Sequence, residues 1–329
     1  MLTTEVQFTD IGVVTARAVE ENLQPGPGEI LLAPETIGIC GSDLHVLTGH
    51  HPFVGPPLVP GHEVAGTVVE TGERVTSVAV GDRVLLNPLV SSADTGPANH
   101  DESAKVIGFK LPGAARTRVV VAATQVRLAP ADMEFDALVL CEPLAAAVHA
   151  VRRVGSRLGR VAVIGAGPIG LSVLLALRAA GADDVTVVDP IPTKQQLATD
   201  LGAGAVLPVA DQLPERAFTV VFDCVANAST LSVAARACLG GGAVTVVGVP
   251  SQEGVAQNIP LSRMQRFEID LLGSGMYTSE DLDEAIEIVA QGVVNPRPLI
   301  SARFPIEQAD RAFDAARSLA TVKVLIDVS

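Results

Sequence analysis

Apolar and polar residues follow two different patterns along the chain. Up to about residue 130 the apolar residues form short runs, such as 29–33, 63–70, 83–86 and 117–122, separated by glycine and proline turns. Short strands with such turns are typical of an irregular β-barrel-like domain. Residues 132–154 then place apolar side chains at mixed helical spacing, so a helical segment is expected after the barrel.

From residue 161 onward, apolar strands alternate with helical segments. The expected strands are 161–164, 185–188, 218–223, 243–247 and 269–272. One expected helix follows the first strand and ends at residue 180, and two others cover 193–201 and 229–239. This alternation predicts a doubly wound parallel sheet.

The end of the chain is expected to return to the first domain. After residue 275 we expect a helix over 279–291, a helix opened by Pro305 and a final apolar strand over 322–328. A strand this apolar must be buried, and the alternating sheet is already complete without it. The predicted domains are therefore 1–142 with 276–329, and an inserted domain, 143–275.

The strand 161–164 is followed at once by the glycines Gly165, Gly167 and Gly170. In such a strand–turn–helix unit the first glycine permits the turn, the second lets a pyrophosphate approach the backbone, and the third lets the helix lie close to the strand. Asp189 follows Gly170 by 19 residues, at the end of the next strand, where a carboxylate accepts hydrogen bonds from a ribose diol. The pattern favours an adenine dinucleotide over a βαβ unit whose glycines serve packing alone.

Composition and charge exclude several classes of protein. Apolar residues make up 48% of the chain and charged residues 18%, and no apolar run approaches the roughly 20 residues of a membrane helix. The first ten residues lack an export signal, so we expect a cytoplasmic protein. The net charge of −14 disfavours nucleic acid and anionic membranes as partners and leaves a small-molecule substrate. The four cysteines form no Cys-x-x-Cys pair, which argues against a disulfide framework.

Metal-binding residue types gather in two short motifs of the first domain. Cys40-Gly-Ser42-Asp43-Leu-His45 and Gly61-His62-Glu63 bring together thiol, imidazole and carboxylate groups next to glycine. These are zinc ligands, and a catalytic zinc needs three of them and an open position. Alone, Cys40 would be interpreted as a buried apolar residue and His62 as a core histidine. Glu142 is a third candidate, because a carboxylate within the apolar stretch 137–148 must be paired or bound to a cation.

At this point the chain resembles the zinc-dependent medium-chain dehydrogenase/reductase superfamily, which has a GroES-like catalytic domain and a Rossmann domain. Beside the two motifs above and the glycine fingerprint, the resemblance rests on Val80-Gly-Asp-Arg-Val, Cys141-Glu-Pro-Leu-Ala and Gly240-Gly-Gly-Ala-Val. Glu142 stands where many alcohol dehydrogenases carry cysteine, which makes the chain similar to the polyol and sugar branch of the sorbitol dehydrogenase type.

The resemblance implies a reaction. A secondary alcohol, of polyol, sugar or cyclitol type, and its ketone would be interconverted by hydride transfer with NAD, and the enzyme would be a homo-oligomer, a dimer or a tetramer. Two other hypotheses remain: a zinc-free quinone or enoyl reductase of the same superfamily, and a dehydrogenase fold that only binds a ligand.

The resemblance also implies roles for individual residues. Cys40, His62 and Glu142 would surround zinc, with Glu63 ligating directly or intermittently. Ser42 and His45 would relay the alcohol proton through the cofactor ribose to solvent. The cofactor-binding residues would be Gly165, Gly167, Pro168, Ile169, Gly170, Asp189, Lys194, Val249 and Lys323, with Asp189 and Lys194 on the adenosine ribose, Ile169 and Val249 against the nicotinamide, and Lys323 near the pyrophosphate.

One stretch departs from the family pattern. Relatives often bind a second, structural zinc through four closely spaced cysteines, but 87–113 contains no cysteine, so we predict one zinc per chain. His100 with Asp94, Asp101 and Glu102 is a possible replacement site, against the simpler interpretation of a solvated polar loop. His50, His51 and Phe53 are either part of a substrate pocket or an exposed turn.

Overall fold

The computed structural model describes residues 2–92, 96–250 and 259–328, and the chain forms two compact units. The first unit is Met1–Glu142 with Ile300–Ser329, and the second is Pro143–Leu299. Residues 276–299, which we had grouped with the first domain, are part of the second unit here. Within that unit Asp281 accepts a hydrogen bond from His149 Nδ1 at 2.8 Å.

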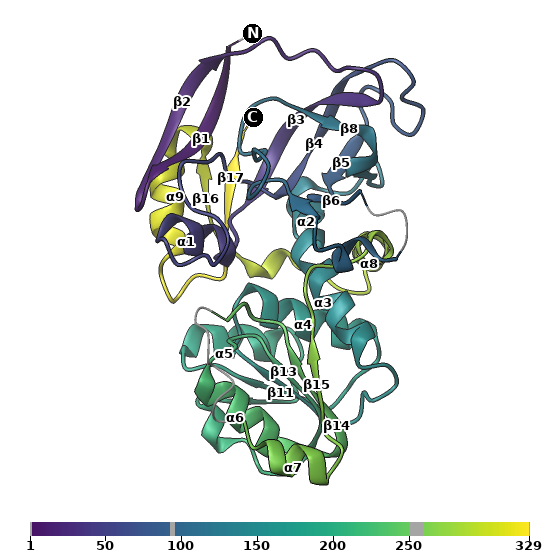
Figure 1. Cartoon of the computed structure of the whole chain (residues 1–329), viewed down its shortest axis with the longest axis vertical. Helices are drawn as coiled ribbons and strands as arrows, with labels where there is room; N and C mark the ends of the chain where they lie inside the picture. The colour runs from purple at the N-terminus through teal and green to yellow at the C-terminus, as the bar shows by residue number, and fades with distance from the viewer. Residues whose placement is uncertain (1, 93–95, 251–258, 329) are drawn as a thin grey trace. The chain divides into compact units, whose positions relative to one another are not determined.

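The first unit is built on a mostly antiparallel sheet with the strand order β16-β17-β3-β4-β5-β9, in which β8 also pairs with β3 (Figure 1). A hairpin, β1–β2, and a short pair, β6–β7, accompany it. The strands are β1 (Leu2–Asp10), β2 (Val13–Glu20), β3 (Glu29–Gly38), β4 (Glu63–Thr71), β5 (Arg83–Leu86), β6 (Leu89–Val90), β7 (Lys105–Val106), β8 (Val119–Ala122), β9 (Val126–Leu128), β16 (Ile300–Pro305) and β17 (Lys323–Asp327). The helices are α1 (Gly41–Leu47), α2 (Phe135–Val139) and α9 (Ala309–Ala316).

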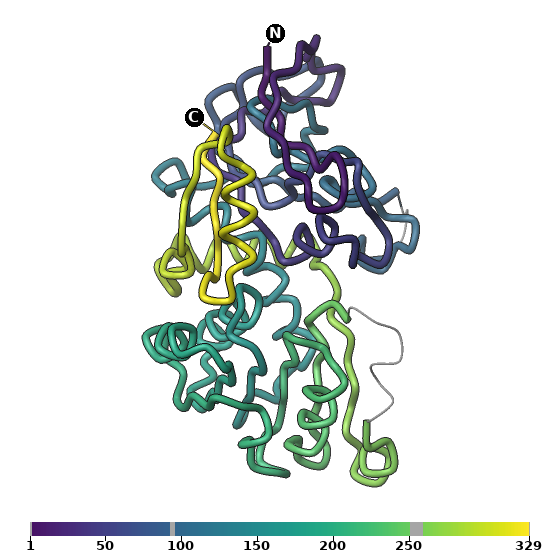
Figure 2. The backbone as a smooth tube through the Cα atoms, turned by 90° about the vertical axis from the view of Figure 1, so that its left-hand side faces the viewer, coloured from purple at the N-terminus to yellow at the C-terminus, as the bar shows by residue number. Residues whose placement is uncertain are grey.

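The terminal strand β17 lies in this first sheet, as predicted. It pairs antiparallel with β3, with Leu325 opposite Gly38, and parallel with β16. In Figure 2 the yellow segments β16, α9 and β17 run side by side. Phe313 of α9 meets Phe8 of β1 edge to face, with ring centroids 5.0 Å apart, in a core to which both ends of the chain contribute. The return of the chain therefore completes the hydrophobic core of this unit.

The second unit contains a fully parallel six-stranded sheet with the order β12-β11-β10-β13-β14-β15. The order reverses between β10 and β13, which is where doubly wound sheets bind ligands beyond the carboxyl ends of their strands. The strands are β10 (Val161–Ile164), β11 (Val185–Val188), β12 (Ala205–Leu207), β13 (Phe218–Asp223), β14 (Cys238–Val246) and β15 (Asp270–Gly273). The helices are α3 (Cys141–Arg153), α4 (Pro168–Ala179), α5 (Pro192–Asp200), α6 (Ala228–Ala237), α7 (Leu261–Arg266) and α8 (Ser279–Ala290).

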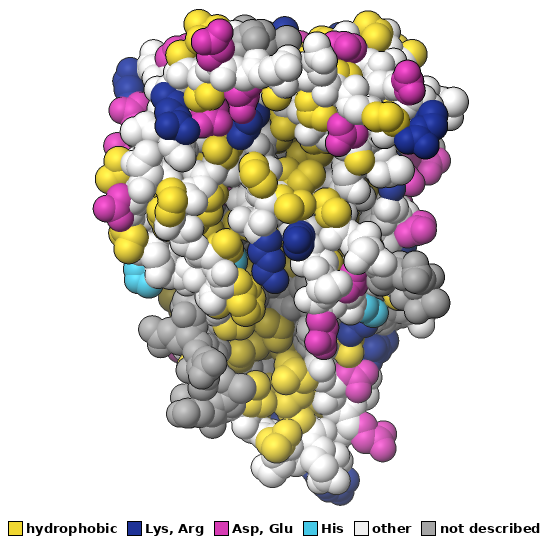
Figure 3. All heavy atoms as spheres, turned by 45° about the horizontal axis from the view of Figure 1, so that its top comes forward, with side chains coloured by type: hydrophobic (Ala, Val, Ile, Leu, Met, Phe, Trp, Pro, Cys, Tyr) yellow, Lys and Arg dark blue, Asp and Glu magenta, His cyan; other side chains and the backbone are white. Residues whose placement is uncertain are grey.

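The predicted architecture of a β-rich domain interrupted by an inserted doubly wound parallel sheet is present. No helix in the described part of the chain is long and apolar enough to cross a membrane. On the face shown in Figure 3, acidic and basic side chains are interspersed with hydrophobic ones.

Candidate functional site

Three metal-binding side chains meet in the first unit. Cys40 follows the end of β3 and occupies the N-cap of α1, while His62 and Glu63 stand at the start of β4. Strands β3 and β4 pair with Gly38 opposite Glu63, so their register brings the two sequence motifs together. One ligand atom from each of Cys40, His62 and Glu63 lies within 4.8 Å of the others.

Glycines keep this corner of the unit closely packed. A Cβ atom on Gly38 would lie 2.0 Å from Glu63 Oε2, and one on Gly61 would lie 2.5 Å from the backbone nitrogen of Ala115. Gly61 also has a φ of 101°, which favours glycine. Both glycines are therefore needed for His62 and Glu63 to reach their positions.

Asp43 orients His62, a role that we did not predict from the sequence. Its Oδ2 accepts a hydrogen bond from the Cys40 backbone at 3.0 Å, and its Oδ1 lies 3.5 Å from His62 Nδ1. Burial by itself lowers the pKa of His62, but Asp43 and Cys40 outweigh it and raise that pKa well above its usual value. A carboxylate behind a metal-binding histidine is a common arrangement that fixes the ring. The signal for Asp43 was its position three residues after the N-cap.

The donor set fits zinc. A thiolate, an imidazole and a carboxylate are its usual ligands, and three protein ligands leave a fourth position for substrate. His62 Nδ1 and Asp43 Oδ1 are both buried and lie 3.5 Å apart, so Nδ1 faces the carboxylate and the other ring nitrogen is the one that would bind a metal. Glu142 is buried at 6% exposure but is not part of the group, so the carboxylate in the group is Glu63, which we had expected to be the reserve ligand. The register of β3 and β4 accounts for the place of Glu63 in the group.

Lys323 is paired with one of the metal-binding side chains. The lysine, which the resemblance places near the pyrophosphate, is 1% exposed and donates to Glu63 Oε1 at 2.7 Å and Oε2 at 2.6 Å. Desolvation lowers the pKa of Lys323, but the charges of Glu63, Cys40 and Glu142 and the hydrogen bond to Glu63 outweigh it, so the pKa is raised. A role of Lys323 toward the pyrophosphate stays a prediction.

Ser42 and His45 both belong to α1, and both are partly buried. Burial lowers the pKa of His45 below its usual value, and the charge of His50 lowers it further. His45 therefore remains neutral, and able to accept a proton, at more acidic pH than a free histidine does.

Two aromatic rings stack beside His62. The ring centroids of His51 and Phe109 are 5.2 Å apart, and those of Phe109 and His62 are 4.9 Å apart. Phe53, in contrast, is 78% exposed. Phe109 was missed because it lies in 87–113, a stretch that the sequence identifies only as polar and free of cysteine.

The glycine turn of the second unit has the expected local geometry. Gly165 has a φ of 98°, and a Cβ atom on Gly170 would lie 1.7 Å from the carbonyl oxygen of Gly165. A Cβ atom on Gly167 would meet no atom within 4 Å. Gly165 thus serves the turn and Gly170 the packing of α4 on β10, while Gly167 is open to a ligand.

Asp189 is linked to this turn through the backbone. Its Oδ2 accepts from the nitrogen of Ala166 at 2.8 Å, and its Oδ1 accepts from the nitrogen of Ile191 at 2.9 Å. Lys194 lies in the first turn of α5 and is partly buried. Pro168 and Ile169 begin α4, and Val249 is 49% exposed. The carboxylate of Asp189 therefore holds the turn and still has lone pairs for further donors.

The possible second metal site in 87–113 does not form a cluster in the described residues. Asp101 accepts instead from Ser91 Oγ at 2.6 Å and from Ser103 Oγ at 2.6 Å, as in a solvated polar loop. Asp94 lies outside the described residues. Cys40, His62 and Glu63 are the only group of three metal-binding side chains in the described ranges.

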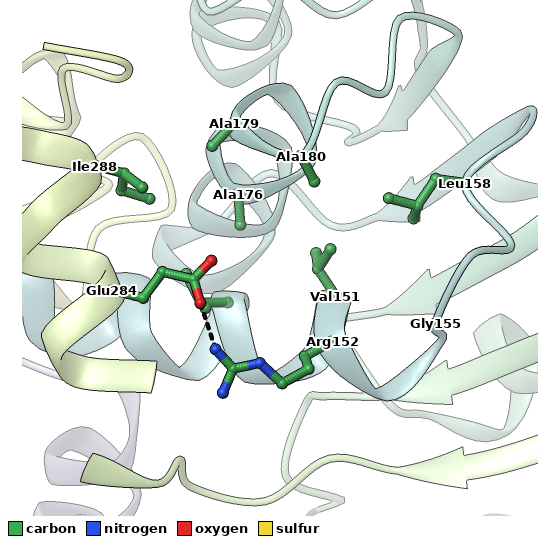
Figure 4. A pocket seen from close by; sticks show the side chains of 10 residues that line it. Val151, Arg152, Gly155, Leu158, Ala176, Ala179, Ala180, Glu284 and Ile288 are labelled. Carbon is green, nitrogen blue, oxygen red and sulfur yellow. Dashed lines mark hydrogen bonds and ion pairs between the residues drawn. The ribbon is translucent and has the colours of Figure 1, made fainter. Parts of the chain in front are cut away.

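A cavity of about 310 Å³ lies in the second unit, lined by residues of α3, α4 and α8 (Figure 4). None of the predicted site residues lines it. Arg152 at its rim is paired with Glu284 and with Asp281, and the walls are mainly alanine, valine and leucine side chains. The cavity is thus distinct from both predicted binding sites.

Known proteins with similar sequences carry the same two parts. Residues 26–131 match the family model described as alcohol dehydrogenase GroES-like domain, and residues 168–291 match that described as zinc-binding dehydrogenase. Sorbitol dehydrogenase from Ovis aries is 32% identical over 333 residues, covering 92% of this chain and 90% of the relative. L-idonate 5-dehydrogenase from Vitis vinifera is 31% identical over 330 residues, covering 92% and 89%.

Solved structures agree with this relationship. A structure described as a zinc-binding dehydrogenase from Sinorhizobium meliloti 1021, bound to NADP, has a TM-score of 0.91 at 29% identity and covers 100% of both chains. Together with the geometry of the two units, these matches show that the chain belongs to the zinc-dependent medium-chain dehydrogenases, in the branch that includes the sorbitol dehydrogenases.

Proposed function

We propose that the chain interconverts a secondary alcohol of the polyol, sugar or cyclitol type and its ketone, with NAD as hydride acceptor and with Cys40, His62 and Glu63 holding one zinc ion. The observation that carries the proposal is the group of three ligands, in which His62 and Glu63 are buried and Cys40 is partly exposed, with Asp43 behind His62. A zinc-free quinone or enoyl reductase would have no use for such a group. When bound, zinc would polarise the alcohol oxygen and make its proton easier to remove.

The chain's own residues would handle the proton. Ser42 would accept it from the alcohol, and the partly buried His45 would pass it to solvent. The lowered pKa of His45 keeps its ring neutral and ready to accept a proton near pH 7. The hydride would leave the carbinol carbon for the nicotinamide, in chemistry that belongs to the cofactor.

We propose NAD in preference to NADP because of Asp189. Its carboxylate is 7% exposed at the end of β11, where a ribose diol could donate to it. A 2′-phosphate there would be repelled, by about 4 kcal/mol for two unit charges 4 Å apart at an effective dielectric of 20, and by less if solvent enters. The Sinorhizobium meliloti relative was solved with NADP, so cofactor choice varies within the fold and must be measured for this chain.

The experiment screens the zinc-loaded protein with NAD against a panel of polyols, sugars, aminocyclitols and simple secondary alcohols. We expect the absorbance of NADH to appear with at least one polyol-type alcohol. We also expect kcat/KM to be at least tenfold higher with NAD than with NADP, because a repulsion of about 1.4 kcal/mol between Asp189 and the 2′-phosphate already lowers kcat/KM tenfold. Equal efficiency with both cofactors would remove the role given to Asp189. Reduction of quinones by NADPH, without zinc and without activity on any alcohol, would instead support the reductase hypothesis.

A further inference from the structure

Lys323 is a buried cation that the proposed reaction does not use. It is the first residue of β17 and is 1% exposed. Its Nζ donates to the carbonyl oxygen of Ile39 at 3.1 Å and to both oxygens of Glu63, at 2.7 and 2.6 Å. An ammonium has three donors, so these acceptors satisfy it completely.

The backbone holds this lysine in place. The nitrogen of Ile39 donates to the carbonyl oxygen of Val324 at 3.0 Å, which joins the start of β17 to the end of β3. Gly38, opposite Glu63 in the sheet, leaves room for the carboxylate, because a Cβ atom there would lie 2.0 Å from Glu63 Oε2. The pairing of strands β3, β4 and β17 therefore holds the ion pair in place, unlike a flexible surface contact.

The same carboxylate belongs to the metal-binding group. Glu63 Oε1 and Oε2 both accept from Lys323, while one of its oxygens lies within 4.8 Å of the ligand atoms of Cys40 and His62. One carboxylate thus serves an internal cation at the position where a metal would bring two further positive charges.

We propose that Lys323 is a positioning residue that holds Glu63 in the metal-free site and weakens metal binding, so that it sets the zinc affinity of the enzyme. This inference rests on the proposed ligand set. Without metal, the ammonium neutralises Glu63, which would otherwise be a buried charge with no partner. With metal, the ammonium repels the dication and competes with it for the same carboxylate. Both effects lower the affinity for zinc.

The direction of the effect separates this role from simple structural support. Replacing Lys323 by methionine keeps the volume and removes the charge. The metal-free variant should unfold at a lower temperature than the wild type, because Glu63 loses its partner. Its zinc affinity should nevertheless rise, by roughly 10- to 100-fold, because the competing cation is gone. A residue needed only for folding would not raise the affinity for a ligand when it is removed.

The experiment titrates zinc-loaded protein with a chromogenic chelator of known zinc affinity and records thermal unfolding with and without zinc. Lys323→Arg keeps the positive charge that repels the dication, so it should not raise the zinc affinity above that of the wild type. Lys105→Met removes an exposed lysine of the same unit and should change neither quantity. An unchanged or weaker zinc affinity in Lys323→Met would overturn the proposal.

A second pair of variants covers the case in which Lys323→Met does not fold without metal. Lys323→Met with Glu63→Gln removes both charges and should unfold at a higher temperature than Glu63→Gln alone, where the ammonium is left unpaired. It should also bind zinc more tightly than Glu63→Gln, because the repulsive cation is absent. An equal or lower affinity would reject the role of Lys323. Loss of zinc in Cys40→Ser tests the ligand set separately, so failure of one idea is distinguishable from failure of the other.

Discussion

At the scale of single residues, nearby charges and burial set the pKa values of the histidines in the site. Asp43 raises the pKa of His62 against the effect of burial, and burial together with His50 lowers that of His45. Two histidines 17 positions apart in the chain are thus pushed in opposite directions. His62 is held by a carboxylate, as a metal ligand is, whereas His45 is kept neutral, as a proton acceptor should be.

The proton relay predicts a pH dependence. His45 has a lowered pKa, so it is neutral at pH values somewhat below its usual 6.5 and becomes protonated only in more acid solution. Alcohol oxidation should therefore persist below pH 6.5 and decline once His45 is protonated. His45→Gln should flatten this acid limb with a modest loss of turnover, because water can replace a partly exposed group. Ser42→Ala should lose roughly 10²- to 10⁴-fold in kcat.

These effects are checked by kcat against pH for the wild type and both variants, with zinc content measured at each pH as the control. Unchanged turnover in Ser42→Ala, under conditions where chemistry limits the rate, would contradict the relay.

At the scale of elements, local patterns were predictable and long-range partners were not. The strand 161–164, its glycine turn and the terminal strand were predicted because each depends on a few consecutive residues. The strand β16 was not predicted, although its alternating burial is typical of a half-buried strand, because its partner β17 lies about 20 residues away and prolines flank it on both sides. For the same reason the pairing of Glu63 with Lys323, 260 residues apart, could not be deduced from either motif.

The glycine turn allows packing and ligand binding to be tested separately. In Gly170→Ala the added methyl would lie 1.7 Å from the Gly165 carbonyl oxygen, so α4 would have to move away from β10. We expect a loss of about 1–3 kcal/mol of stability, the usual cost of overpacking, and weak NAD binding as a consequence. Gly167 has a φ of −74° and open space around its Cβ position, so Gly167→Ala should fold with wild-type stability.

Gly167→Ala should nevertheless bind NAD at least tenfold more weakly, because the methyl would stand where the pyrophosphate approaches the backbone. Thermal unfolding and a fluorescence titration with NADH measure the two effects on the same samples. If Gly167→Ala bound the cofactor as tightly as the wild type, the pyrophosphate would not lie on this turn.

At the scale of the whole molecule, the chain folds into two units whose boundaries depend on side chains as much as on strands. We predicted the first boundary from the change of hydrophobic pattern after residue 142. We placed the second boundary after residue 275, whereas α8 groups with the second unit. Asp281 is one contact within that unit: it accepts from Thr278 at the start of α8 and from His149 of α3. A buried carboxylate shared by two helices is not visible in a hydrophobic pattern.

The number of metal ions is a property of the whole chain, and we predict one zinc per chain. Of the four cysteines, only Cys40 belongs to the group of ligands in the described residues. Cys141, Cys224 and Cys238 all have raised pKa values, chiefly because burial disfavours the thiolate that zinc requires. The stretch 87–113 contains no cysteine, so it cannot supply the four thiolates of a structural site.

Elemental analysis should therefore give a ratio near one for the wild type, and close to zero for Cys40→Ser and His62→Ala. Glu63→Ala should lose most of the zinc, whereas Glu142→Ala should retain it, because Glu142 lies outside the group. Cys238→Ser, a buried cysteine of the second unit, serves as the matched control and should keep one zinc. Two tightly held ions per chain, or full occupancy in Glu63→Ala together with loss in Glu142→Ala, would show that the carboxylate ligand is Glu142 or that a second site exists.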